Sequence, residues 1–378
     1  MRAHIIYDNY FTPDGEGMTI GGIQTYITNL IPLLRDAGYA VTVYQRADKD
    51  FHKDLGQFDV YGVTVDSSCK RPVISQALQS KMLQHVDMTN DLLVYGCESF
   101  ITQRYPCRSV AIQHGISWDV PFDPCSSLRY FRHYLGKCYL AWKTIQRVSK
   151  VNRLVCVDYN FVNWHRATAT YTLIQHTVIP NFSVIPTQMP EKANDSVNII
   201  FARRMAPVRG SKIFADVADR LLREHFTQPI HITIAGTGPE AGYMHSVLDK
   251  YENVEFISYN SEDSHKIHAG MDIAVVPTLA SEGTSLSLLE AMASGCAVVC
   301  TDVGGMTNIV LNKYNGMMTA AGNAEGLYAA IKYLIDNTEE RRRMATTGYE
   351  TVRRCFSHEQ WAKAWKQVIE GIRDEQQS

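Results

Sequence analysis

Residues 281–295 read SEGTSLSLLEAMASG and carry two glutamates, Glu282 and Glu290. Thr284 or Ser285 is a suitable helix N-cap and Gly295 a suitable stop, and the residues between them are strong helix formers. On this predicted helix Glu290 falls within the apolar face. A carboxylate in such a position is costly unless something hydrogen-bonds it.

A nucleotide-linked, hydroxyl-rich ligand would suit this stretch. A ribose diol offers two adjacent donors to Glu290, and the free N–H groups at the helix start suit a phosphate. Glu282, one loop earlier, could reach hydroxyl groups attached to that phosphate. The alternative is that Glu290 hydrogen-bonds a neighbouring group in a purely structural helix.

The wider segment 282–305 resembles the glutamate signature of retaining glycosyltransferases of the GT-B fold, glycosyltransferase family 4. The similarity includes the spacing of the glutamates, the Glu-Ala-Met-Ala-x-Gly core, the apolar run 297–300 and the turn at Gly304 and Gly305. The resemblance implies that Glu282 contacts the donor sugar and Glu290 the ribose. It also implies that backbone amides bind the diphosphate, at Gly283, Thr284, Ser285 and Leu286.

Composition is ordinary for a globular protein. The chain has 378 residues, 45% of them hydrophobic, and a formal net charge of −2, so overall charge gives no argument for nucleic acid as a partner. Nine cysteines are scattered without metal-site spacing, which favours free thiols in a reducing compartment. The beginning of the sequence does not resemble a secretion signal, and no apolar run is long enough for a membrane span. We therefore expect a cytoplasmic location.

Short β-branched runs alternate with helical patterns throughout, which predicts parallel α/β sheets. A polar, proline-bearing stretch at 185–196 is the best linker. We predict two doubly wound Rossmann-like domains that face a central cleft, 1–185 on the acceptor side and 186–355 for the nucleotide sugar. The resemblance implies that a terminal helix within 356–378 packs back on the first domain.

Two arginines follow the predicted strand 198–202. Arg204 and Arg209 could converge on a phosphate, although solvated surface charge is the simpler interpretation of arginines in a loop. The segment is similar to the family's Gly-Arg-Leu-x-x-x-Lys-Gly signature, which implies a diphosphate role for both. Two departures stand out: Arg203 replaces the glycine, and Arg209 replaces the lysine.

Glycine-rich turns follow two further strands. Gly21 and Gly22 resemble the family's first-domain loop, which faces the donor. Gly236 begins a turn that, with Gly242, could be mistaken for a dinucleotide fingerprint. The resemblance places that turn in the donor domain and the base near Tyr259.

His114 ends a predicted strand and should project at the cleft mouth. A lone histidine is more often structural, but the resemblance implies contact with the transferred sugar. Asp48 and Asp50 form an Asp-x-Asp in a charged stretch that we interpret as a solvated loop, and His265 and His268 lack further ligands. We expect no metal and no cofactor.

Residues 128–153 combine basic and aromatic side chains without an acidic residue. Such a segment favours an anionic membrane surface or a phosphorylated lipid. The alternative is a helix with its aromatics in the core and a solvated charged face.

These observations together predict a metal-independent, retaining transfer from a nucleotide-diphosphate sugar to a hydroxyl acceptor, with a lipid-linked or cell-surface saccharide precursor as acceptor. The enzyme would work at the inner face of the membrane. The resemblance favours front-face return of the acceptor. A GT-B nucleotide-sugar epimerase, an NAD-dependent oxidoreductase and a non-catalytic nucleotide-sugar sensor are the alternatives.

Overall fold

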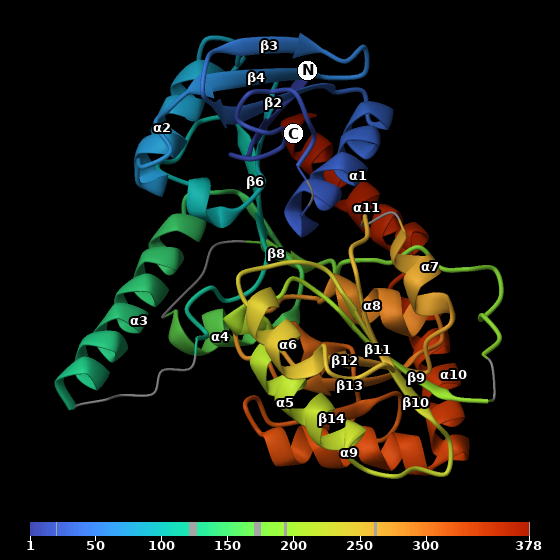
Figure 1. Ribbon diagram of the computed structural model, residues 1–378. Coiled ribbons are helices and arrows are strands. Elements are labelled where there is room, and N and C mark those ends of the chain that lie inside the picture. The colour runs from blue at the N-terminus through green and yellow to red at the C-terminus, as the bar shows by residue number, and fades with distance from the viewer. Residues whose placement is uncertain (20, 121–126, 170–174, 193–194, 261–262, 378) are drawn as a thin grey trace. The chain divides into compact units, whose positions relative to one another are not determined.

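The computed structural model describes the chain apart from residues 20, 121–126, 170–174, 193–194, 261–262 and 378 (Figure 1). The chain forms two compact units. Unit 1 comprises residues 1–114, 123–180 and 361–378, and unit 2 comprises residues 115–122 and 181–360. The division predicted from the sequence, into domains 1–185 and 186–355 and a terminal helix within 356–378, stays a prediction.

Unit 1 contains a sheet in the order β3-β4-β2-β1-β5-β6-β7-β8. Its pairs are parallel except for β3 with β4. The strands are β1 (Arg2–Ile6), β2 (Ala40–Ala47), β3 (Phe51–Asp54), β4 (Asp59–Thr64), β5 (Leu92–Tyr95), β6 (Arg108–Gln113), β7 (Arg153–Cys156) and β8 (Gln175–Val178). The strand order reverses on the two sides of β1, which creates a topological switch point there.

The helical segments of unit 1 connect these strands. They are α1 (Gly22–Asp36), α2 (Arg71–Met82), η1 (Glu98–Phe100), α3 (Ser127–Val148), α4 (Tyr159–Thr168) and, from Trp361 onward, α11 (His358–Gln377). The terminal helix packs tightly within unit 1, because Trp365 is 1% exposed and its indole N–H donates to the Tyr26 hydroxyl at 2.7 Å.

Unit 2 contains a fully parallel sheet in the order β11-β10-β9-β12-β13-β14. The strands are β9 (Val197–Ala202), β10 (Ile230–Ala235), β11 (Val254–Ile257), β12 (Ile273–Val276), β13 (Ala297–Thr301) and β14 (Met317–Thr319). The helical segments are η2 (Pro207–Arg209), α5 (Ser211–Leu222), α6 (Ala241–Leu248), α7 (Ser264–Ala269), α8 (Leu286–Ala293), η4 (Gly304–Asn308), α9 (Ala324–Asp336) and α10 (Thr338–Cys355). The switch point of this sheet lies between β9 and β12.

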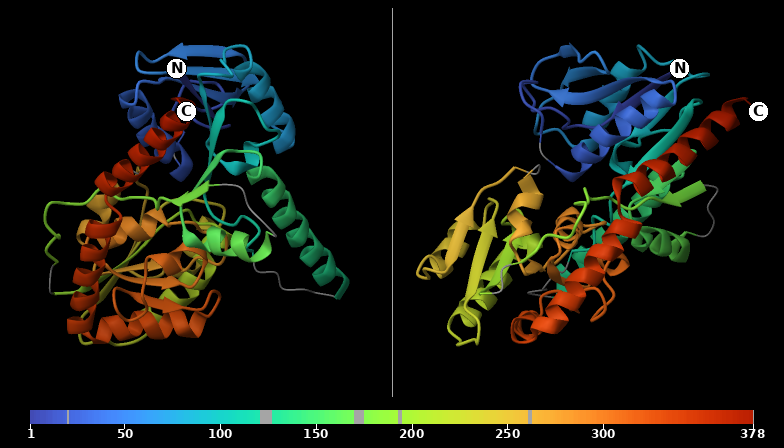
Figure 2. Two further views of the ribbon diagram at one scale, coloured as in Figure 1. Left: turned by 180° about the vertical axis from the view of Figure 1, so that it is seen from behind. Right: turned by 90° about the vertical axis from the view of Figure 1, so that its right-hand side faces the viewer.

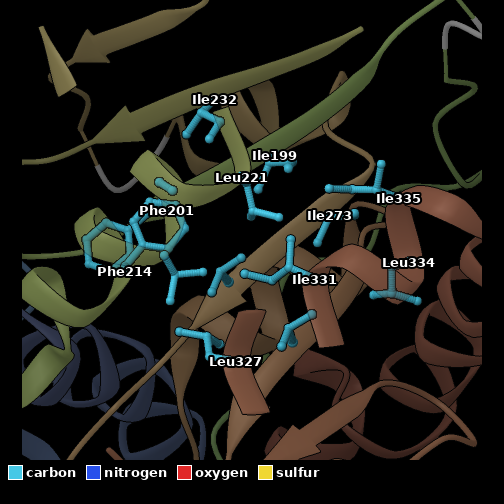
Figure 3. Packing of buried hydrophobic residues seen from close by; sticks show 14 of the residues in the cluster. Ile199, Phe201, Phe214, Leu221, Ile232, Ile273, Leu327, Ile331, Leu334 and Ile335 are labelled. Atoms are coloured by element: carbon cyan, nitrogen blue, oxygen red, sulfur yellow. The ribbon is translucent and has the colours of Figure 1, made fainter. Parts of the chain in front are cut away.

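Both faces of the unit 2 sheet are buried, which explains its nearly continuous apolar strands. On one face Ile199, Phe201 and Ile273 pack with residues of α5 and α9 such as Phe214 and Ile331 (Figure 3). On the other face the alternate strand residues pack against α8 and α10. The predicted class, α/β with two parallel-sheet units, is confirmed.

Three strands, β3, β8 and β14, fall outside the short β-branched runs from which the sequence predicts its strands. β3 forms at the end of the charged stretch, where Asp48 and Asp50 lie in the bend before it. β8 and β14 are also short edge strands. An edge strand needs backbone pairing on only one side and little apolar burial, so it leaves a weak hydrophobic pattern.

Candidate functional site

The loop that carries Glu282 leaves the switch point of the unit 2 sheet. Val276 ends β12, and the chain reaches α8 ten residues later. Ser281 adopts φ +52°, an uncommon conformation for a residue with a side chain, and its N–H donates to the carbonyl of Asp119 at 3.0 Å. Strain of this kind persists only where the surroundings hold it.

Gly304, in the turn after β13, contacts this loop. Its φ is +53°, and a Cβ at this position would lie 1.9 Å from the carbonyl oxygen of Glu282. The next N–H, of Gly305, donates to that same oxygen at 3.1 Å. The glycine pair therefore fixes the backbone of Glu282 by close approach.

Three side chains converge on one oxygen of Glu282. Its Oε2 accepts from the Arg203 guanidinium at 3.0 Å, from Arg209, and from the Thr278 hydroxyl at 3.3 Å. Arg203 also donates to Thr278. Arg203 follows β9 and Thr278 follows β12, so the cluster straddles the switch point.

Charge is concentrated in this cluster. Arg203 is 7% exposed, and burial lowers the pKa of its guanidinium while the Glu282 carboxylate opposes that shift. Arg209 is half-buried on η2 and Arg204 is exposed. Two guanidinium groups share one carboxylate, which leaves a positive excess suited to a phosphate.

The start of α8 lies immediately after this loop. Ser285 is the N-cap residue, and both Thr284 and Ser285 are buried. The amide of Asn181 donates to the carbonyl of Thr284 at 2.7 Å and so holds the entry to the helix. The first N–H groups of a helix have no partner within it, which makes this end suitable for an anion.

Glu290 lies further along α8. Its Oε2 accepts from the hydroxyl of Ser264, the first residue of α7, at 2.7 Å. Burial raises the pKa of the Glu290 carboxyl, and this hydrogen bond partly offsets the effect. Burial and the nearby charge of Glu290 also raise the pKa of Tyr259 to about 12. Tyr259, Ser264 and Glu290 therefore form one partly buried group.

Gly236 has a packing role in the observed turn. Its φ is +130°, and a Cβ there would lie 2.4 Å from the carbonyl oxygen of Arg203. The glycine thus lets the ends of β9 and β10 approach each other, which explains Gly236 without a dinucleotide.

The other predicted residues lie in unit 1. His114 follows β6, and its Nε2–H donates to the carbonyl of Gly96 at 2.9 Å. Burial lowers the pKa of His114 to about 4, so the ring is neutral at pH 7 and Nδ1 is an acceptor. Gly21 is the N-cap of α1 and Gly22 its first residue.

Sequence reasoning missed four contributors to the site. Arg203 stands where the family signature has glycine. Asn181 lies in a stretch similar to the family's Ile-Pro-Asn-Gly element but was given no role, and Thr278 and Ser264 belong to no motif. Their hydrogen bonds to the site join residues between 4 and 103 positions apart. The one signal in the sequence was the position of Arg203 directly after an apolar strand. An arginine there is expected to be buried, and a buried charge needs a partner.

Residues 196–337 match the family model described as glycosyl transferases group 1. Sucrose-phosphate synthase from Thermosynechococcus elongatus has a similar fold, with a TM-score of 0.79 over 99% of this chain and 100% of its own, at 14% identity. The chain has the GT-B fold, and residues 196–337 are similar to the group 1 glycosyl transferases.

Two further proteins are similar to this chain, one in fold and one in sequence. Anabaena HepE in complex with UDP-glucose has a TM-score of 0.72 at 15% identity, covering 98% of this chain and 100% of that one. A glycogen synthase from Thermodesulfovibrio yellowstonii is 28% identical over 177 residues, 46% of this chain. The chain spans about a third of that relative, since the match covers 34% of it.

Proposed function

We propose that this protein transfers a sugar from a nucleoside-diphosphate sugar to a hydroxyl acceptor, with retention of the anomeric configuration. The observation that carries the proposal is the convergence of Arg203, Arg209 and Glu282 at the switch point, directly before the start of α8. This arrangement offers positive charge, the start of a helix and a fixed carboxylate in one place.

Cleavage of the anomeric carbon–oxygen bond leaves negative charge on the diphosphate. Arg209 and the amides of residues 284–286 stabilise that charge, and Arg204 adds a guanidinium from the same strand end. Because these donors are fixed before the reaction, little reorganisation opposes catalysis. We expect the reaction to need no metal.

The two glutamates bind hydroxyl groups of the donor. The contacts of Arg203, Arg209 and Thr278 orient Glu282 through Oε2, and we assign Oε1 to a hydroxyl of the sugar. Glu290 accepts hydrogen bonds from the ribose diol. These donors offset the cost of burying its charge. We assign Tyr259 to a contact with the nucleotide base of the donor.

The acceptor hydroxyl attacks the anomeric carbon from the face that the diphosphate leaves. Its oxygen bonds that carbon, and its proton passes to the departing phosphate oxygen. We assign to neutral His114 a hydrogen bond from a sugar hydroxyl to Nδ1, and to Gly21 and Gly22 a backbone contact with the donor. The acceptor is a lipid-linked or cell-surface saccharide precursor in polysaccharide assembly. We propose that this reaction takes place in the cytoplasm, at the inner face of the membrane.

Thermal unfolding with UDP, GDP, ADP or NAD, each without and with magnesium, tests the donor site. We expect one nucleoside diphosphate to raise the melting temperature, independently of metal, and Glu290→Gln to weaken that response. The exposed Glu339→Gln is the matched control. No response to any diphosphate, or a response to NAD alone, would contradict the proposal.

Turnover tests the reaction itself. The nucleotide identified by stabilisation selects the donor sugars to be tried with a panel of saccharide acceptors. Nuclear magnetic resonance of the early product then gives the anomeric configuration. Inversion, or conversion of the donor sugar into its epimer without an acceptor, would overturn the assignment.

A further inference from the structure

Helix α3 in unit 1 exposes its apolar side chains. Of its 22 residues, the buried ones are Thr144 and Val148, both in the last two turns. Figures 1 and 2 show its earlier turns extending away from the sheet of unit 1. Eight large apolar residues on it are between 43% and 68% exposed: Leu128, Tyr130, Phe131, Tyr134, Leu135, Tyr139, Leu140 and Trp142.

Five of the exposed apolar residues lie on one face of the helix. Leu128, Phe131, Leu135, Tyr139 and Trp142 follow one another at intervals of three and four residues, so they form one stripe. Two of these rings contact each other, since the ring centroids of Tyr139 and Trp142 lie 6.1 Å apart. This stripe is an apolar surface that the fold of unit 1 leaves exposed.

A cationic stripe runs beside it. Arg129, Arg132, Lys143 and Arg147 occupy the neighbouring face, and residues 127–148 include no Asp or Glu. The helix end is fixed, because the ammonium of Lys150 donates to the carbonyl of Thr102 at 2.7 Å. The helix is thus held at its C-terminal end and presents apolar and positive faces along the preceding turns.

Charge decides between the possible occupants of this surface. A second copy packed on the same stripe would bring two sets of like charges together, which opposes association. The surface of an anionic bilayer accepts both stripes at once, apolar residues into the acyl boundary and cations against the headgroups. Tyr and Trp are also the residues that favour this boundary. Within the described residues, no helix is long and apolar enough to cross a bilayer.

We propose that α3 docks unit 1 on an anionic phospholipid bilayer, with the helix lying in the interface plane. This deepens the proposed function and rests on it in one respect only: it would bring the transferase to a membrane-held acceptor. The docking itself depends on the two stripes of α3 and not on the donor site.

Flotation of the full chain with vesicles tests the docking. We expect binding to phosphatidylcholine vesicles that contain phosphatidylglycerol, much weaker binding to phosphatidylcholine alone, and loss of binding as salt rises. Arg132→Gln with Lys143→Gln should weaken the binding about 25-fold, about fivefold for each charge removed. Phe131→Ser with Trp142→Ser should weaken it by at least about tenfold.

Matched controls lie on other elements. Leu311→Ser with Tyr314→Ser removes equally exposed apolar side chains, and Arg342→Gln with Arg354→Gln removes exposed charges of α10. Both control pairs should bind vesicles as the parent does. Equal binding to neutral and anionic vesicles, or α3 variants that bind like the parent, would overturn the docking. An α3-dependent dimer without vesicle binding, seen by sedimentation, would overturn it as well.

The two proposals fail separately. Stabilisation by a nucleoside diphosphate should be the same in the α3 variants as in the parent, which also shows that they are folded. A chain that floats with anionic vesicles but ignores every nucleotide would contradict the proposed transferase and support the docking.

Discussion

Burial raises the pKa of Glu290, so the folded chain binds a proton at this carboxyl more tightly than the unfolded chain does. Its contribution to stability is therefore fully present below the unfolded pKa and is lost as the pH rises through the folded pKa. We expect Glu290→Gln to be more stable than the parent at pH 8, with the difference shrinking toward pH 4. Thermal unfolding across this range measures it. A destabilised variant at pH 8 would favour the structural interpretation of Glu290.

Arg203 should contribute mainly to stability. It is buried between Thr278 and Glu282, and its removal takes away its hydrogen bonds to both, although Glu282 keeps Arg209 as a partner. We expect Arg203→Ala to cost about 3 kcal/mol in urea unfolding. Arg203→Ala combined with Glu282→Ala should cost less than the sum of the two single variants. Additive losses would show that the two groups do not interact.

Arg209 and Arg204 should contribute mainly to rate. Each is assigned to the diphosphate, and removal of one donor of this kind typically costs about 10²–10³ in kcat. We expect that loss in Arg204→Ala and in Arg209→Ala, with the stability of Arg204→Ala within about 0.5 kcal/mol of the parent because its side chain is exposed. Full turnover in both variants would remove them from the site.

Glu282, Glu290, Arg204 and Arg209 could be proposed from sequence because they lie in two short stretches that resemble family signatures. The role of Arg203 could not, since its partner lies 79 positions away and only folding brings the ends of β9 and β12 together. The same holds for Ser264, which becomes the partner of Glu290 through the packing of α7 on α8.

At the scale of elements, the loop from β12 to α8 depends on η4. A side chain at Gly304 would collide with the carbonyl of Glu282, whereas Gly322, also at positive φ, has open space around it. We expect Gly304→Ala and Gly322→Ala each to lose about 1 kcal/mol from the backbone conformation. Only Gly304→Ala should also weaken nucleoside-diphosphate binding, as measured by calorimetry. Equal binding by both variants would separate the loop from the donor site.

The central strands of both sheets could be predicted because burial on two faces demands apolar runs. Edge strands such as β8 could not, because their residues alternate between exposed and half-buried positions. The 185–196 stretch illustrates a different limit. Composition suggests a linker, yet the ammonium of Lys192 donates to the carbonyls of His268, Ala269 and Ser294 and so binds this stretch to unit 2.

For the whole molecule, the alternation of strands and helices was enough to predict two parallel-sheet units. The sequence did not predict how the chain is divided between the two units. Residues 115–122 belong to unit 2, although the residues before and after them belong to unit 1. This short segment contributes the carbonyl of Asp119 to the Glu282 loop. No composition signal marks such an excursion, since it is defined by long-range contacts.

Helix α11 packs in unit 1, so its loss should destabilise unit 1 and leave unit 2 folded. Trp365 fills the core of unit 1 and hydrogen-bonds Tyr26, so Trp365→Ala should destabilise that unit by about 3–5 kcal/mol. The exposed Lys366→Ala, on the same helix, should have little effect. Hydrogen exchange read by peptide should show the loss of protection in β5 and not in β13, because each unit has its own core. Equal losses in both strands would mean that the two units unfold as one, and unchanged protection in β5 would mean that α11 contributes little to the stability of unit 1.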